Sequence, residues 1–338
     1  MVVDAILAND EWDLVVFRLR YLSPRVDKFY IGESAVTFAG KPKEPFFANR
    51  IGKLQSLGFD VDVIDLAIPD DLLAGNERWA IETYARNMLL ETVASKHPED
   101  LVLFSDADEL PSLDQVDGLV SQGAELVIAS IPTQVCLRKA NWIEYEPHQW
   151  RGKWGNGLIG KHWVPRIRRG TYPMAEGEPG AHFSYVGMSS SDVRRKYQAF
   201  SHGELDRDEM ASDEFLGFAD HFHISHLGRA LDPGAGLLTV VQPADFTSVQ
   251  KLAFKQNPNW FSFEPIHQST VRRLVASWIL FREVRGTPKV SRSDAYAPVY
   301  SWRWVRHAVT YLVVWVGWKT LNGLGLIRLI KRSPKMLP

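Results

Sequence analysis

Two aspartates, Asp106 and Asp108, stand two positions apart directly after a short apolar run. Residues 101–104 have the length and composition of a buried strand, so both carboxylates are expected on the turn that ends it. Two carboxylates in such a turn, together with phosphate oxygens and water, suit Mg²⁺ or Mn²⁺. A cation there would neutralise a diphosphate and help it leave, as a Lewis acid does in group transfer. The short side chain of Ala107 is expected to leave room for a nucleotide.

The elements that position this turn follow from the pattern of the first 135 residues. Short apolar runs at residues 2–8, 28–31, 61–66, 101–104 and 126–131 alternate with helical spacing at residues 12–22, 77–96 and 113–122. Such alternation predicts an α/β protein with a mostly parallel sheet flanked by helices. Ligands bind outside the carboxyl ends of the strands in sheets of this kind, which is where the two aspartates fall.

Asn9 and Glu33 follow the first two predicted strands and therefore share a sheet edge with Asp106. Side chains at such positions could contact the base and ribose of a nucleotide. For Glu33 a buried ion pair, for instance with Arg86, is an equally good interpretation. Within the acidic turn, one aspartate could bind metal while the other caps the turn, and Glu109 is expected to brace a backbone N–H or an arginine.

Two other chemistries also place acidic residues after a strand. A phosphatase of the aspartyl-phosphate type needs Thr or Val soon after its aspartates, whereas Glu109-Leu110-Pro111 follows here. Nucleotidyl transfer needs a glycine-rich basic loop after the first strand. The segment at that place, Asn9-Asp10-Glu11, carries two negative charges, which would repel a triphosphate.

Composition narrows the class of protein further. The 338 residues predict two domains, or one domain with a long extension. A 45% hydrophobic and 23% charged chain is an ordinary globular one, and its net charge of −1 gives no indication of a nucleic-acid partner. The single cysteine, Cys136, excludes an internal disulfide and favours a reducing compartment. The first residues lack the pattern of a secretory signal, so a cytoplasmic location is expected.

Three blocks of the chain, in the same order, resemble glycosyltransferase family 17, whose best-known member adds N-acetylglucosamine to N-glycans. The first block includes residues 3–14, 18–19 and 26–34, the second Arg86-Asn87 and residues 104–111, and the third residues 180–185 and 196–204. The family usually shows Gly-Trp-His where this chain has Gly180-Ala181-His182. An aromatic wall of the pocket is therefore expected to be missing.

The resemblance implies a GT-A-like fold and an inverting transfer of a sugar, N-acetylglucosamine or a similar one, from a UDP-sugar to a glycan or glycolipid. It implies a divalent metal, Mn²⁺ or Mg²⁺, held by Asp106, Asp108 and His182, although His182 could also be a packed core histidine. The predicted donor contacts are Asn9, Glu33, Arg86, Asp106 and His202. The alternative function is a non-catalytic glycan-binding protein on the same fold.

An inverting transfer needs a general base for the acceptor hydroxyl, usually a carboxylate. Glu204 is the first candidate because it lies in the third block beside His202. Glu176, Glu178 and Asp192 are alternatives, and a solvated position at the end of a helix is an equally good interpretation of Glu204.

Two further groups of residues, three histidines and four tryptophans, could bind a metal or a sugar. His221, His223 and His226 could form a zinc site, but helical spacing puts only the last two on one face, which favours a polar–aromatic surface near an acceptor instead. Tryptophans cluster in the irregular middle of the chain, where their rings could stack on sugars. They are Trp142, Trp150, Trp154 and Trp163.

The predicted domains are a catalytic domain, residues 1–260, and a helical, basic and aromatic extension, residues 261–338. The catalytic domain would comprise a nucleotide-sugar half, residues 1–135, and an acceptor half, residues 136–260. After Asp294 no acidic residue occurs, but seven basic ones do: Arg303, Arg306, Lys319, Arg328, Lys331, Arg332 and Lys335. Residues 301–338 are therefore predicted to attach peripherally to an anionic membrane surface at its cytoplasmic face, or else to pack on the catalytic domain.

Overall fold

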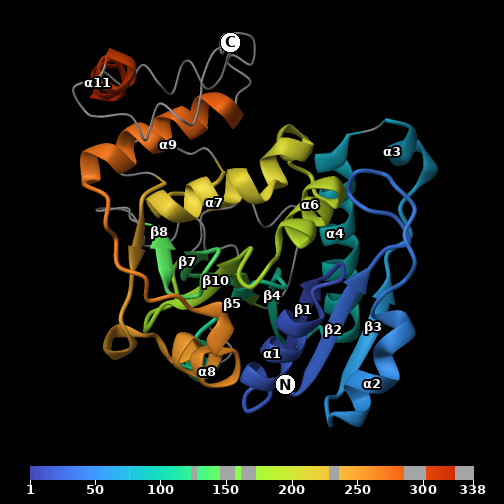
Figure 1. Cartoon of the computed structure of the whole chain (residues 1–338). Coiled ribbons are helices and arrows are strands. Elements are labelled where there is room, and N and C mark those ends of the chain that lie inside the picture. The colour runs from blue at the N-terminus through green and yellow to red at the C-terminus, as the bar shows by residue number, and fades with distance from the viewer. Residues whose placement is uncertain are drawn as a thin grey trace. The chain divides into compact units, whose positions relative to one another are not determined.

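The computed structural model describes residues 1–75, 77–122, 128–144, 157–160, 173–227, 236–284 and 302–323 (Figure 1). The chain divides into two compact units. The first comprises Met1–Ile143, Pro147–Asp208 and Val240–Phe263, and the second comprises Glu144–Glu146, Glu209–Thr239 and Glu264–Pro338. This division differs from the predicted boundary near residue 260, because residues 209–239 group with the C-terminal segment.

The first unit contains a mostly parallel sheet whose described strands run in the order β3-β2-β1-β4-β9-β6. Strands β3, β2, β1 and β4 pair in parallel, whereas β9 pairs antiparallel with both β4 and β6. The bounds are β1 Val2–Leu7, β2 Lys28–Glu33, β3 Val61–Asp65, β4 Leu101–Asp106, β6 Ile128–Ile131 and β9 Gly157–Gly160. The predicted fold class, a mostly parallel sheet flanked by helices, is confirmed.

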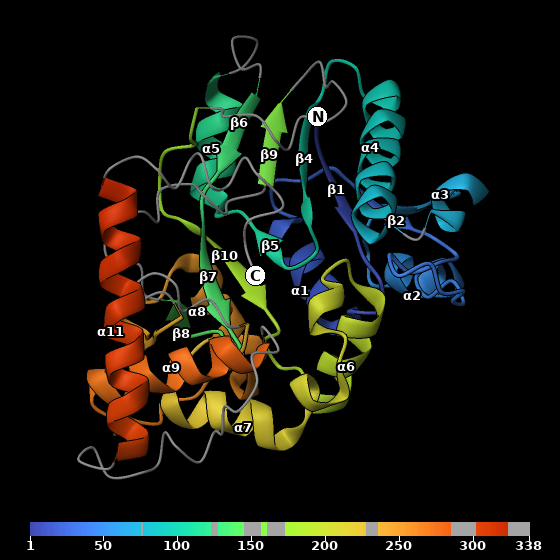
Figure 2. The ribbon, with the colours of Figure 1, turned by 90° about the horizontal axis from the view of Figure 1, so that it is seen from above.

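Helices cover both faces of this sheet because the side chains of a strand alternate between its faces. Val3 and Ala5 of β1 belong to the same apolar cluster as residues of α4 (Arg78–Lys96). Ile6 belongs instead to the cluster that includes the buried residues of α1 (Trp12–Leu22). Figure 2 shows the two helices beside the parallel strands. Because both faces are buried, β1 is an almost continuous apolar run.

A second sheet in this unit contains β8, β7, β10 and β5 as neighbours. β10 pairs in parallel with β7 and antiparallel with β5, which is the short strand that follows the acidic turn. The bounds are β5 Glu109–Leu110, β7 Thr133–Leu137, β8 Trp142–Glu144 and β10 Gly180–Ser184. The pairing places His182 opposite Glu109 and so brings the third sequence block beside the second.

The other helices of the first unit are α2 (Ile51–Ser56), α3 (Asp70–Ala74), α5 (Leu113–Gln122), α6 (Ser190–Ala199) and α8 (Ser248–Gln256). Short 3-10 turns are η1 (Ala48–Arg50), η4 (Gly203–Leu205), η6 (Pro243–Asp245) and η7 (Pro258–Trp260); η5 (Asp208–Ala211) lies at the unit boundary. The start of α6 is fixed by a capping box, in which Ser189 and Asp192 satisfy each other's backbone N–H groups.

Cys136 lies on β7 and is completely buried. Burial raises the pKa of its thiol to about 12, and a hydrogen bond from Gln250 of α8 opposes that rise only in part. Gln250 also donates to the Ala140 carbonyl at 2.8 Å, so α8 is tied to the end of β7. The cysteine is therefore a packed core residue.

The second unit contains α7 (Asp213–Phe222), α9 (Thr270–Val284) and α11 (Trp302–Gly323), with β11 (Leu238–Val240) at its border. Arg273 of α9 is buried and donates to the carbonyls of Phe222 and His223, where α7 ends. Of the histidines considered for zinc, His223 and His226 are buried, whereas His221 is exposed and contacts Gln268 at 3.0 Å. The described part of the chain holds no group of three His, Cys, Asp or Glu side chains suited to a metal.

Helix α11 exposes a stripe of apolar side chains. Val309, Leu312, Val313 and Val316 are each more than half exposed and follow one another at helical spacing. Among the described helices, none is both long enough and apolar enough to cross a membrane.

Candidate active site

The acidic turn joins the two sheets of the first unit. β4 ends at Asp106, Ala107 and Asp108 form the turn, and β5 begins at Glu109. Ala107 is 5% exposed and packs in the main apolar core. Its small side chain therefore packs beneath the turn, and the room that it leaves for a nucleotide stays a prediction. The carbonyl of Asp108 accepts the N–H of Phe183 at 2.8 Å and so ties the turn to β10.

A buried arginine, Arg18 of α1, holds this turn from the core. Two of its nitrogens donate to the carboxylate of Asp4 at 2.7 and 2.8 Å, and neither side chain is more than 1% exposed. The guanidinium also donates to the Glu109 carbonyl at 2.6 Å, the Asp106 carbonyl at 3.2 Å and the Ser105 hydroxyl at 2.8 Å. All five N–H groups of the side chain have partners, so the backbone of the turn is fixed in one geometry.

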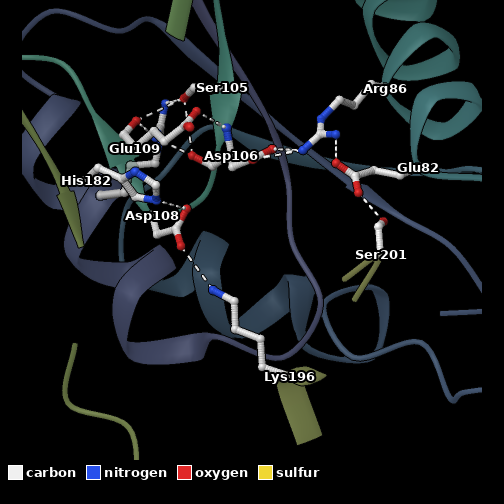
Figure 3. Close-up of polar contacts among 10 residues, drawn as sticks. Glu82, Arg86, Ser105, Asp106, Asp108, Glu109, His182, Lys196 and Ser201 are labelled. Carbon is white, nitrogen blue, oxygen red and sulfur yellow. Dashed lines mark hydrogen bonds and ion pairs between the residues drawn. The ribbon is translucent and has the colours of Figure 1, made fainter. Parts of the chain in front are cut away.

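Asp106 points toward α4. Both of its carboxylate oxygens accept from Arg86 at 2.8 Å, and Arg86 also forms an ion pair with Glu82 (Figure 3). The Asp106 side chain remains 25% exposed. Glu109 braces the same turn, because its Oε2 accepts the backbone N–H of Asp106 at 3.1 Å. That is the role predicted for Glu109.

Asp108 points in another direction, toward α6 and β10. Lys196 of α6 donates to its Oδ2 at 3.0 Å, and the Nε2 of His182 lies 3.6 Å from its Oδ1 (Figure 3). Burial alone would raise the pKa of Asp108, but the positive charges of Lys196 and His182 outweigh burial and hold it well below its usual range. Asp108 is therefore an anion at neutral pH.

The turn carries oxygen donors of the kind that a divalent cation binds, although Asp106, Asp108 and His182 do not form a three-residue metal-binding group among the described residues. Asp106 and Asp108 supply the oxygen donors that Mg²⁺ and Mn²⁺ prefer. His182 could add an imidazole nitrogen only after losing a proton, because burial lowers its pKa but the negative charge of Asp108 raises it by more. The Nδ1 of His182 is buried and has no hydrogen-bond partner within the described ranges. Each carboxylate pairs with a protein cation, so a bound metal would compete with Arg86 for Asp106 and with Lys196 for Asp108.

The structure also defines the surroundings of Asn9. Its side-chain oxygen accepts from Lys43 at 2.7 Å, and its amide donates to Asp10 at 3.2 Å. Burial lowers the pKa of Lys43, and the nearby negative charges of Glu33 and Glu11 oppose that change. Asn9 lies just beyond β1, at the predicted sheet edge, and its donor contact stays a prediction.

Glu33 has an internal partner that was not predicted. It is 3% exposed, and its two oxygens accept the backbone N–H groups of Phe46, Phe47 and Ala48. Arg86 pairs instead with Glu82 and Asp106, which corrects the predicted Glu33–Arg86 pair. By accepting these N–H groups, Glu33 fixes the loop that follows β2. The predicted contact of Glu33 with the sugar-nucleotide donor stays a prediction.

The third sequence block folds onto the start of α4. Arg78 donates to the Phe200 carbonyl at 3.1 Å and to Asp206 at 2.8 Å, and Ser201 donates to Glu82. His202 lies edge-on to Trp79, with ring centroids 4.9 Å apart. These contacts attach the segment to the helix that carries Arg86, while the donor contact of His202 stays a prediction.

Glu204 lies in the 3-10 turn η4 of this segment, and its role as base also stays a prediction. Two of its alternatives have structural partners. Glu178 accepts the N–H of Ser248 at 2.8 Å, and Asp192 belongs to the capping box of α6. Glu176 is exposed.

Strand packing explains the small residues at the first two positions of Gly180-Ala181-His182. A Cβ on Gly180 would lie 2.0 Å from the Leu110 carbonyl oxygen, so only glycine allows β10 and β5 to approach so closely. Ala181 is fully buried in the core, and strand alternation directs it away from the face that carries His182. The expected loss of an aromatic wall of the pocket stays a prediction.

Two lysines at the site, Lys196 and Lys43, were not predicted. Lys196 lies inside the third sequence block, which was the available signal. Lys43 belongs to no block and carries no local signal. Of the clustered tryptophans, Trp142 is buried on β8, so it is a core residue; Trp150, Trp154 and Trp163 lie outside the described residues.

The fold and site together define an α/β protein with paired carboxylates at the carboxyl edge of its parallel sheet. Residues 1–219 match the family model described as glycosyltransferase family 17. The chain therefore belongs to glycosyltransferase family 17, and the predicted resemblance is confirmed.

Curated relatives are similar over a shorter segment. The chain is 30% identical over 123 residues to the beta-1,4-mannosyl-glycoprotein 4-beta-N-acetylglucosaminyltransferases of Homo sapiens and Rattus norvegicus. The match covers 34% of this chain and 22% of each relative, so the chain aligns with about a fifth of their length.

Proposed function

We propose that the protein transfers a sugar from a UDP-sugar to a hydroxyl group of a glycan or glycolipid, with inversion at the anomeric carbon and with Mn²⁺ or Mg²⁺. The observation that carries this proposal is the acidic turn. It stands at the end of a parallel strand, is fixed from below by Arg18, and presents Asp106 and Asp108 among the cationic side chains of Arg86 and Lys196. The names of the relatives support N-acetylglucosamine as the first donor sugar to test.

The chain's own residues divide the work of such a site. A bound divalent cation would neutralise the diphosphate as it leaves. Asp106 and Asp108 would hold that cation, with His182 as a third ligand. Arg86 and Lys196 add fixed positive charge beside the leaving diphosphate, which stabilises the charge that develops in the transition state. Glu204 is the carboxylate proposed to accept the proton of the acceptor hydroxyl.

The test is UDP release. The protein is incubated with Mn²⁺ and a panel of UDP-sugars, with and without simple glycan acceptors, and UDP is measured. The wild type is expected to release UDP from one donor, and Asp106→Asn is expected to lose about 10³-fold or more of that rate. Asp117→Asn is the matched control, because Asp117 is an exposed carboxylate of α5 paired with Arg25.

Two results would count against the proposal. Absence of UDP release from every donor by the wild type would contradict transfer. A second result concerns glycan binding. If the wild type is inactive, and if wild type and Asp106→Asn bind glycans equally well, the non-catalytic glycan-binding function is favoured.

We also propose that α11 attaches the protein to an anionic membrane surface. The exposed stripe at Val309, Leu312, Val313 and Val316 supports this, as does the absence of acidic residues after Asp294 in the sequence. The full chain is expected to sediment with phosphatidylserine vesicles at low salt and to be released when Leu312 and Val313 are both changed to Glu. Equal recovery of wild type and variant in the supernatant would contradict the proposal.

A further inference from the structure

Lys196 is a largely buried cation whose ion-pair partner within the described ranges is Asp108. Its side chain is 15% exposed, and its Nζ lies 3.0 Å from the carboxylate of Asp108 and 4.9 Å from the ring centre of Tyr185. Tyr185 is itself buried, with a φ of 58° that side-chain-bearing residues rarely adopt. The backbone at the end of β10 is thus held in an unfavourable conformation that sets an aromatic face beneath the ammonium group.

Arg86 differs from Lys196 in the number of carboxylates it contacts. Arg86 pairs with both Glu82 and Asp106, so it keeps a buried counter-ion even when Asp106 binds something else. In the part of the chain that the structure describes, Lys196 has no second carboxylate at ion-pair distance. Burial lowers its pKa, whereas the charge of Asp108 and the more distant charge of Glu11 raise it. A buried charge without a partner is strongly unfavourable. Loss of Asp108 as a partner therefore favours another anion beside Lys196.

The proposed reaction supplies that anion. A UDP-sugar brings a diphosphate to the same carboxylates that would take up the divalent cation, and ammonium groups bind phosphate oxygens well. The cation and Lys196 compete for Asp108 when the nucleotide is absent. When the nucleotide is present, the diphosphate gives Lys196 a replacement partner, and the competition disappears.

We propose that Lys196 is an exchangeable counter-ion that couples metal binding to donor binding: it neutralises Asp108 in the metal-free protein and moves to the donor diphosphate when Asp108 binds the cation. This inference rests on the proposed function and deepens it. It predicts that the protein binds Mn²⁺ weakly by itself and tightly together with UDP. By linkage, Mn²⁺ strengthens UDP binding by the same factor.

The experiment compares wild type, Lys196→Met and Arg194→Met by titration calorimetry. Arg194→Met is the matched control, since it removes a cation of the same helix that pairs with Asp208. Without nucleotide, Lys196→Met is expected to bind Mn²⁺ about tenfold more tightly than wild type, because the competitor is gone. At saturating Mn²⁺, Lys196→Met is expected to bind UDP about tenfold more weakly, whereas its affinity for uridine is unchanged. Arg194→Met should behave as wild type in all three titrations.

The outcomes separate this inference from the proposed function. If wild type releases UDP from a UDP-sugar but Lys196→Met binds Mn²⁺ no more tightly, Lys196 does not compete for Asp108 and the inference is overturned alone. Unchanged UDP affinity in Lys196→Met overturns the transfer of Lys196 to the diphosphate. A wild type that binds neither Mn²⁺ nor UDP overturns the proposed function itself. Lys196→Gln, which keeps a hydrogen-bond donor, repeats the test if thermal unfolding shows Lys196→Met to be misfolded.

Discussion

The two sides of the acidic turn use the same kinds of charged groups in opposite ways. On the core side, Arg18 and Asp4 are fully buried, and every donor of the arginine contacts an internal acceptor. On the other side, Asp106 and Asp108 pair with cations; the Asp106 side chain is 25% exposed, whereas Asp108 is largely buried. The inner pair holds the turn rigid, and the outer pairs can exchange partners. The types of the charged residues do not distinguish a structural ion pair from a functional one. The number of internal hydrogen-bond partners and the exposed fraction of the side chains distinguish them.

Among the variants of the two sides, Arg18→Met is expected to change the free energy of unfolding most. Removing the guanidinium leaves the carboxylate of Asp4 buried without a partner, which is expected to lower the free energy of unfolding by about 3–5 kcal/mol. Urea denaturation at constant m-value measures this change. Arg25→Met is the control, because Arg25 and Asp117 form a pair whose side chains are 43% and 45% exposed. That change is expected to cost less than about 1 kcal/mol.

The double variant Arg18→Met with Asp4→Leu sharpens the same prediction. Replacing both charges by apolar groups removes the unpaired carboxylate, so part of the lost stability is expected to return. Its turn should nevertheless lose alignment, since the carbonyls of Asp106 and Glu109 lose their donor. A single Arg18→Met variant within about 1 kcal/mol of wild type would contradict the division between the two sides.

A smaller effect is expected on the outer side, in the helix that carries Lys196. Asp192→Ala removes half of the capping box at the start of α6 and is expected to cost about 1 kcal/mol. The hydrogen bond from the Ser189 hydroxyl is the main reason that the pKa of Asp192 is lowered. A lowered carboxyl pKa stabilises the fold above the unfolded value, about 4, and this contribution is lost as pH falls through the folded value.

The measurement for Asp192 is therefore made at two pH values. Wild type and Asp192→Ala should differ in free energy of unfolding at pH 7, and the difference should shrink toward pH 3. Affinity for UDP should fall by about two- to fivefold at pH 7, because a frayed α6 positions Lys196 less well. A difference in stability that persists unchanged at pH 3 would show that the carboxylate does not act through this cap.

The sequence predicted the elements better than the contacts between them. Periodicity placed α1 and the strand before the acidic turn within two residues, because local spacing reflects which face of each element is buried. It did not predict Arg18 as the support of the turn, although Arg18 falls in the first sequence block. Arg18 and the turn are 88 to 91 positions apart, and no local pattern encodes a contact of that kind.

The candidate site shows the same limit. Asp106, Asp108, Arg86 and His182 were predicted and lie together, because strand ends and the family blocks mark them. Lys196 contacts Asp108 across 88 positions of the sequence and was missed. Glu33 was expected at the nucleotide or beside Arg86, but a carboxylate near a strand end can equally well bind loop backbone, and sequence spacing does not distinguish these outcomes.

Cys136 gives the molecule a practical property. It is the single thiol of the chain, and its complete burial, with a pKa of about 12, makes it inert to thiol reagents in the folded state. A cysteine introduced at Val313, on the exposed stripe of α11, would then be the one position that takes up a dye. A polarity-sensitive fluorophore there would report directly whether α11 leaves water when lipid vesicles are added, with no need to alter the native cysteine.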